Sequence, residues 1–162
     1  MTTQAAPNPD PVVAGLNLVL TETFERVTGV YLDRGTSLFE TLAGVSAATA
    51  SRPLGNTSNT LAAHVRHMAF YLRVADGYVR GTDRTRKDWG AIWRAANVVT
   101  EAEWAAAIAE LREGYRLAQA LLADADAAKD PDWVAGATAL IAHNAYHLGE
   151  IRQALGWLAE SG

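Results

Sequence analysis

The chain has 162 residues, a net charge of −4 and no cysteine. Its length suits one domain that buries its own core. The absence of cysteine excludes disulfides, thiolate nucleophiles and thiolate metal ligands. No block of basic residues is present, so we do not expect a nucleic acid as partner. No apolar run approaches the ~20 residues of a membrane span, and the N-terminus lacks a basic region followed by a hydrophobic one. We therefore expect a cytoplasmic protein that does not enter a membrane.

The N-terminal region divides into a lead and a helix. Residues 1–9 are small and polar and include prolines, and we expect them to be disordered. Asp10 and Pro11 are typical of the N-cap and the first position of a helix, because proline lacks a donor that this position leaves unpaired. Apolar residues then recur at helical spacing, which predicts a helix over 12–27.

A second helix is predicted over 37–51. Ser37 and Glu40 have the spacing of a capping box, in which each side chain reaches a free backbone donor at the start of the helix. The helix should end before Pro53, since the residue ahead of a proline resists helical angles. Residues 55–60 then form a polar loop that offers several helix caps.

The stretch 61–79 predicts a helix with two different sides. Its charged side carries Arg66, Arg73, Asp76 and Arg80. Its buried side carries His64, Met68, Tyr71 and Ala75, with His67 on the flank of that side.

The connection 81–99 shows no sustained periodicity, and a segment of this length without structure is typical of a crossover or a functional loop. Trp89 and Trp93 suggest that it packs onto the rest of the protein. Further helices are predicted over 101–122, opened by a second capping box, and over 132–159. No segment alternates at period two, so we predict an all-α fold. Long helices with short turns and one long connection describe a four-helix bundle with a crossover, folded as a single domain over 10–160.

The last predicted helix carries the most unusual residues of the chain. Its predicted inner face reads Gly136, Leu140, His143, His147, Ile151, Ala154 and Leu158. His143 and His147 are four residues apart, so both imidazoles lie on one face of a helix. Neutral imidazoles placed in this way can chelate one transition metal. Left unpaired in a core, each would cost about 1–3 kcal/mol.

Two interpretations follow from this pattern. In the first, His143 and His147 bind a metal together with a histidine of the 61–79 helix, and a water takes the open position of a catalytic site. Glu150 projects from nearly the same face and would orient a ligand histidine or act as a general base. In the second, these are core histidines whose partners are neighbouring tyrosine, asparagine and glutamate side chains, and the protein is a non-catalytic dimeric bundle.

Several stretches of the chain are similar to a known family. Thr60-Leu-Ala-Ala-His-Val-Arg-His67, followed by His143-Asn-Ala-Tyr-His147-Leu-Gly-Glu-Ile151, resembles the DinB/YfiT-like superfamily of metal-binding bundles. The stretch from Tyr31 to Leu42 also looks like one bacterial branch of it. The resemblance covers about residues 30–158 and implies an up-down-down-up four-helix bundle. The predicted 12–27 helix precedes the resembling stretch and would then be an extra N-terminal segment.

The resemblance also implies a set of ligands. The two histidines of the family's His-x-x-x-His motif correspond to His143 and His147. The third ligand of the family corresponds to His67 when the position is counted from Thr60, whereas helical phase alone favours His64. Family members usually have glutamine or a similar polar residue where Glu150 stands.

The function implied by the resemblance is that of a metal-dependent enzyme whose substrate is a small molecule that the sequence does not identify. Characterised relatives include S-transferases and isomerases that use low-molecular-weight thiols such as bacillithiol or mycothiol, and others are described as metal-dependent hydrolases. Zinc or nickel would suit the nitrogen ligands. Family relatives often pair as two-fold dimers, and large apolar side chains such as Trp89, Trp93 and Trp157 would favour a homodimer here.

Overall fold

A computed structural model describes residues 10–54, 59–95 and 98–160. Within these ranges the chain contains helices and no strands, so the predicted all-α class is confirmed. The predicted lead 1–9 and residues 55–58 of the predicted polar loop lie outside the described residues.

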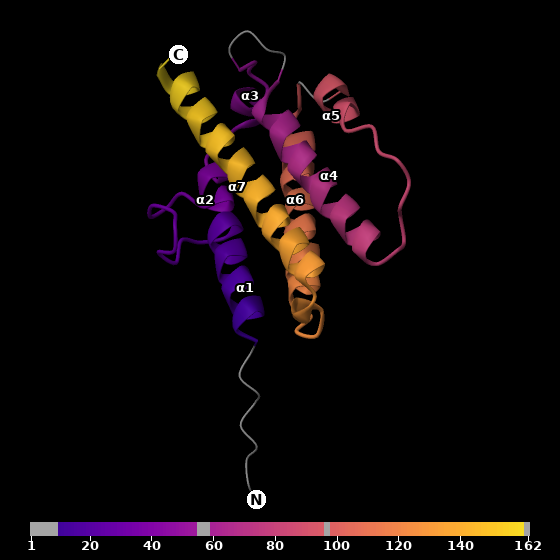
Figure 1. Cartoon of the computed structure of the whole chain (residues 1–162). Helices are drawn as coiled ribbons and strands as arrows, with labels where there is room; N and C mark the ends of the chain where they lie inside the picture. The colour runs from indigo at the N-terminus through magenta and orange to yellow at the C-terminus, as the bar shows by residue number, and fades with distance from the viewer. Residues whose placement is uncertain (1–9, 55–58, 96–97, 161–162) are drawn as a thin grey trace, which may run out of the picture.

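Four long helices and several short ones make up the described chain (Figure 1). They are α1 (Pro11–Phe24), α2 (Leu38–Leu42), α3 (Ala47–Ala50), α4 (Leu61–Val79), α5 (Gly90–Ala95), α6 (Glu101–Leu122) and α7 (Pro131–Glu160), with the 3₁₀ turn η1 (Ala127–Lys129) before α7. In Figure 1, α1 and α7 run upward, whereas α4 and α6 run downward. Each of α1 and α4 packs against both α6 and α7, so the core lies between the four long helices.

The first helix is one of these four long helices rather than an extra segment beside them. Leu20 and Phe24 of α1 are fully buried. The ring of Phe24 stacks on that of Tyr115 in α6, with centroids 5.0 Å apart. The apolar stripe of α1 is therefore covered by the protein's own α6 and α7, which corrects the prediction that this helix is an addition to the bundle.

The helix α1 ends at Phe24, earlier than its apolar pattern predicts, and Glu22 near its end binds the loop that follows. Its carboxylate is fully buried and accepts hydrogen bonds from the backbone N–H groups of Thr28, Val30, Tyr31 and Leu32, at 2.7–2.9 Å, and from the Thr28 hydroxyl. Burial by itself would raise the pKa of Glu22, but these hydrogen bonds outweigh it and hold the pKa well below its usual range. The loop after α1 is thus wrapped around one carboxylate, which was not predicted from the sequence.

The predicted helix over 37–51 is wrong as a single element, because the structure has two short helices there, α2 and α3. The capping box is present, since the backbone N–H and the hydroxyl of Ser37 both donate to Glu40, at 3.1 and 2.6 Å. The first of them, α2, ends at Leu42, shortly before Gly44, a residue that weakens a helix interior. Ser46 then caps α3 by accepting from the backbone N–H of Thr49 at 3.1 Å.

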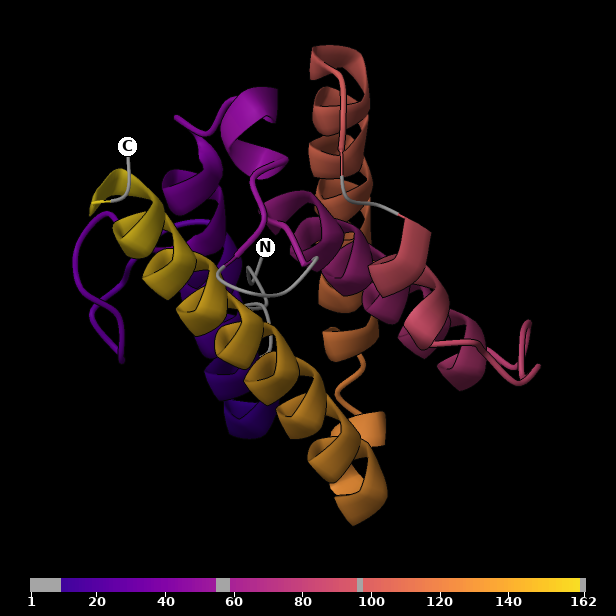
Figure 2. The same cartoon turned by 90° about the horizontal axis from the view of Figure 1, so that it is seen from above.

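The crossover 81–99 also differs from the prediction, because it contains the short helix α5. This helix lies beside α4, as Figures 1 and 2 both show. The two helices that flank the crossover have the predicted bounds, and both are capped by threonine side chains. Thr60 accepts from the N–H of Ala63, and Thr100 accepts from that of Glu103, each at 3.2 Å.

The buried face of α7 is rotated from the predicted one. Its buried residues are Ala137, Leu140, Ile141, Asn144, His147, Leu148, Ile151 and Leu158. Gly136 is exposed, whereas His143 and Ala154 are half-buried. Because α7 packs against α1 as well as α4, the centre of its buried face lies near Asn144, and the two histidines lie toward α4. Asn144 is fully buried and donates to the carbonyl of Leu140 at 2.7 Å.

Candidate metal centre

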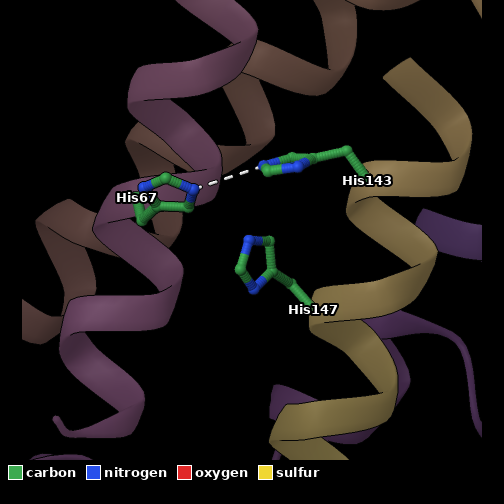
Figure 3. A group of neighbouring side chains, drawn as sticks. All are labelled: His67, His143 and His147. Carbon is green, nitrogen blue, oxygen red and sulfur yellow. Dashed lines mark hydrogen bonds between the residues drawn. The ribbon is translucent and has the colours of Figure 1, made fainter. Parts of the chain in front are cut away.

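Two helices supply all the predicted site residues. His64 and His67 come from α4, and His143, His147 and Glu150 come from α7. Figure 3 shows the rings of His67, His143 and His147 pointing toward one another across the space between the two helices. Nε2 of His67 lies 3.2 Å from Nε2 of His143. One ring nitrogen from each of the three histidines lies within 4.8 Å of the others.

Helical spacing and packing together produce this convergence. The spacing of His143 and His147 on α7 brings their rings to 4.6 Å, measured between centroids. The ring of His67 then lies 5.3 Å from that of His143 and 4.8 Å from that of His147. His67 and His147 are buried, and His143 is half-buried at the edge of the cluster.

The geometry fits a transition-metal ion. Nitrogen ligands lie about 2.0–2.1 Å from zinc, so two of them at a tetrahedral angle are about 3.3–3.4 Å apart. The Nε2 atoms of His67 and His143, at 3.2 Å, are close to that separation. Imidazole donors without thiolate or a carboxylate in the same group suit zinc, nickel and similar ions. The three-histidine group could therefore hold one such ion.

Burial keeps the imidazoles of His67 and His143 in the neutral form that binds metals. Desolvation, followed by the neighbouring histidines His147, His143 and His64, lowers the pKa of His67 to about 4. Desolvation also lowers the pKa of His143 below its usual value. At neutral pH both rings therefore carry a lone pair that can be directed at an ion.

Glu150 determines which nitrogen of His147 carries the proton. Nδ1 of His147 lies 2.7 Å from Oε2 of Glu150, so Nδ1–H donates to the carboxylate and Nε2 keeps its lone pair. Burial would raise the pKa of Glu150, but hydrogen bonds from Tyr146 and His147 outweigh it and lower the pKa. Glu150 is thus an ionised acceptor at the outer side of the cluster.

His64 and His67 have different neighbours in the structure. His67 lies with His143 and His147, whereas Nδ1 of His64 faces Glu150 at 3.6 Å. His64, His147 and Glu150 form a second group whose ligand atoms lie within 4.8 Å of one another. The helical period predicted His64 on the buried side of the 61–79 helix and His67 on the flank of that side. In the structure both histidines are buried.

Aromatic rings cover the cluster. The Trp93 ring of α5 lies 5.0 Å from that of His64 and 4.9 Å from that of His67. Tyr71 stacks on His143 with centroids 4.0 Å apart and an angle of 28° between the rings. Neither Trp93 nor Tyr71 was predicted from the sequence to lie at the site. Tyr71 stands four residues after His67, and that spacing is the signal that could have placed it there.

No helix among the described residues is long and apolar enough to cross a membrane. Comparison of the chain with models of protein families, with curated proteins and with solved structures finds no match. The resemblance to the DinB/YfiT-like superfamily therefore stays a prediction that depends on the residues quoted above.

Proposed function

We propose that this protein binds one divalent transition-metal ion through His67, His143 and His147 and is a metal-dependent enzyme. The observation that carries the proposal is the convergence of three imidazole nitrogens from two helices within 4.8 Å. The resemblance to the DinB/YfiT-like superfamily supports the same three ligands. Zinc and nickel are the ions that we expect, because both accept nitrogen donors.

The chemistry we propose is hydrolysis of a small molecule, or transfer of a low-molecular-weight thiol to one. When bound, such an ion lowers the pKa of a water or thiol and makes it a nucleophile at neutral pH. His67 and His143 are held neutral by burial, and Glu150 holds the proton of His147 at Nδ1. The ring of Trp93 packs against the rings of His64 and His67.

A second candidate is a non-catalytic bundle whose histidines are structural. It is favoured by the distance of 3.2 Å between Nε2 of His67 and Nε2 of His143, which also suits a hydrogen bond between two neutral imidazoles. The hydrogen bond from His147 to Glu150 would stabilise the third ring without an ion. In that case the cluster needs no metal.

Elemental analysis of the purified protein separates the two candidates. We expect about one zinc or nickel ion per chain, and we expect His147→Ala to lose most of it while circular dichroism still reports a helical fold. Metal content that is unchanged in this variant would mean that the site is wrong.

Activity is tested next, in the wild-type protein and in His147→Ala. The assays are thiol transfer to an electrophile, with bacillithiol and mycothiol as donors, and ester hydrolysis, each with and without added metal. Activity that needs the ion and is lost in the variant supports an enzyme. A protein that holds the ion but is inactive in every assay supports metal binding without catalysis.

A further inference from the structure

An open cleft of about 430 Å³ lies beside the histidine cluster, between the start of α4 and the C-terminal half of α7. Leu54, Ala154 and Trp157 form its apolar wall, and His64, Glu150 and Gln153 face it with polar groups. The cleft adjoins the proposed metal centre, because its Glu150 carboxylate is also the acceptor for His147.

His64 is the unusual residue in this cleft. The residue is buried at 6% exposure, and its Nδ1 has no hydrogen-bond partner among the described residues. The nearest carboxylate oxygen, Oε2 of Glu150, is 3.6 Å away, which is longer than a hydrogen bond. A buried polar atom left without a partner costs about 1–3 kcal/mol. Such an atom at the wall of a cleft indicates a position where a bound group supplies the missing hydrogen bond.

The chemistry of the cleft defines the kind of group that would fit. Glu150 is the only carboxylate among the described residues that line it, and no lysine or arginine is among them. A carboxylate has about four acceptor sites, more than the hydrogen bonds from His147 and Tyr146 occupy here. The unpaired Nδ1 of His64 is a further ring nitrogen that can accept a hydrogen bond. A group that satisfies both residues at once therefore carries several N–H donors and a positive charge, as an ammonium does.

We propose that this cleft binds a small primary amine joined to an apolar group, with the ammonium between Glu150 and His64 and the apolar part against Ala154 and Trp157. As a statement about the substrate of the metal centre, this rests on the proposed function. As a statement about a binding site, it does not depend on the metal.

Benzylamine and its neutral analogue benzyl alcohol are suitable probes, because they have the same ring and differ in charge. We expect calorimetric or NMR titration of the full chain to show that benzylamine binds at least about tenfold more tightly, since charge-assisted hydrogen bonds are the stronger kind. Glu150→Gln removes the charge and keeps an acceptor, and it should abolish this preference. Equal affinities of the wild-type protein for the two probes would overturn the proposal.

A pair of substitutions on α7 tests where the probe binds. Ala154→Leu adds bulk to the cleft and should weaken benzylamine binding at least about tenfold, because the ring loses its space. Ala135→Leu is the matched control, since Ala135 is exposed on the same helix and does not line the cleft. Unchanged binding in Ala154→Leu would place the probe elsewhere and overturn the proposal.

The titrations are repeated with chelator-treated and zinc-loaded protein, so that the two proposals can fail separately. Selective benzylamine binding by a protein that takes up no zinc when zinc is added would support the cleft and contradict the proposed function. A protein with one bound ion that does not distinguish benzylamine from benzyl alcohol would contradict only the amine site.

Discussion

The imidazole of His147 and the carboxylate of Glu150 lie one turn apart on α7, with Nδ1 and Oε2 separated by 2.7 Å. This hydrogen bond leaves Nε2 as the nitrogen that His147 directs toward His67 and His143. A carboxylate in this position orients a ligand histidine and raises its basicity. The pair thus links the proposed metal centre to the cleft that holds His64.

The first prediction concerns this pair. Glu150→Ala should weaken metal binding about 10–100-fold, the usual cost of losing an outer partner of a ligand histidine. Glu150→Gln should retain most of the affinity, because its side-chain oxygen still accepts from Nδ1–H of His147. Competition titration with a metal chelator measures both constants. If both variants bound the metal with the wild-type affinity, the hydrogen bond between His147 and Glu150 would have no effect on metal binding.

A second prediction ranks the two histidines of α4. His67→Ala removes a proposed ligand and should cost more metal affinity than His64→Ala, which removes a neighbour that faces Glu150. Titration of the two variants with zinc gives the ranking, and their thermal unfolding controls for loss of the fold. The opposite ranking would assign the third ligand to His64 and leave the other two in place.

The third prediction concerns pH and the metal-free protein. The pKa of His67 is lowered from 6.5 to about 4 by burial and by its histidine neighbours. The unfolded chain therefore binds more protons than the folded one in this window, and the folded state loses stability as the pH falls from about 6.5 to about 4. The free energy of unfolding, measured with urea and a chelator present, should decrease over this range. His67→Phe should decrease less steeply, and an equal slope in both proteins would exclude His67 as a cause.

A fourth prediction tests the packing of α4 on α6. Gly114 of α6 lies so close to α4 that an added Cβ would meet Leu72 at 3.0 Å. Gly114→Ala should therefore destabilise the fold by about 1–3 kcal/mol. Gly149→Ala on α7 is the control, because an added Cβ there meets nothing within 4 Å and should stabilise the helix by roughly 0.5–1 kcal/mol. Urea unfolding measures both, and a stable Gly114→Ala would contradict the close contact.

The fifth prediction is that the protein is a homodimer. Trp93 is half-buried against the α4 histidines, whereas Trp89 and Trp157 are 41% and 43% exposed. Exposed rings of this size favour a self-complementary interface. Sedimentation at micromolar concentration should give a mass near twice 17.3 kDa. A single species at 17.3 kDa would contradict the prediction.

Features that depend on residues close together in the chain could be predicted from the sequence. The helices 61–79 and 101–122 have the predicted bounds because threonine caps at their starts and a helical apolar period lie within the segments themselves. The position of His143 and His147 on one face of a helix follows from their spacing alone.

Which surfaces these elements cover depends on the tertiary structure. It made α1 one of the four packed helices, and it rotated the buried face of α7 toward Asn144. It also brought His67, rather than His64, to the other two histidines and covered the cluster with Trp93. The physical reason is that a helical period fixes the relative directions of side chains along one helix. The direction that becomes buried depends on neighbouring helices that are distant in sequence.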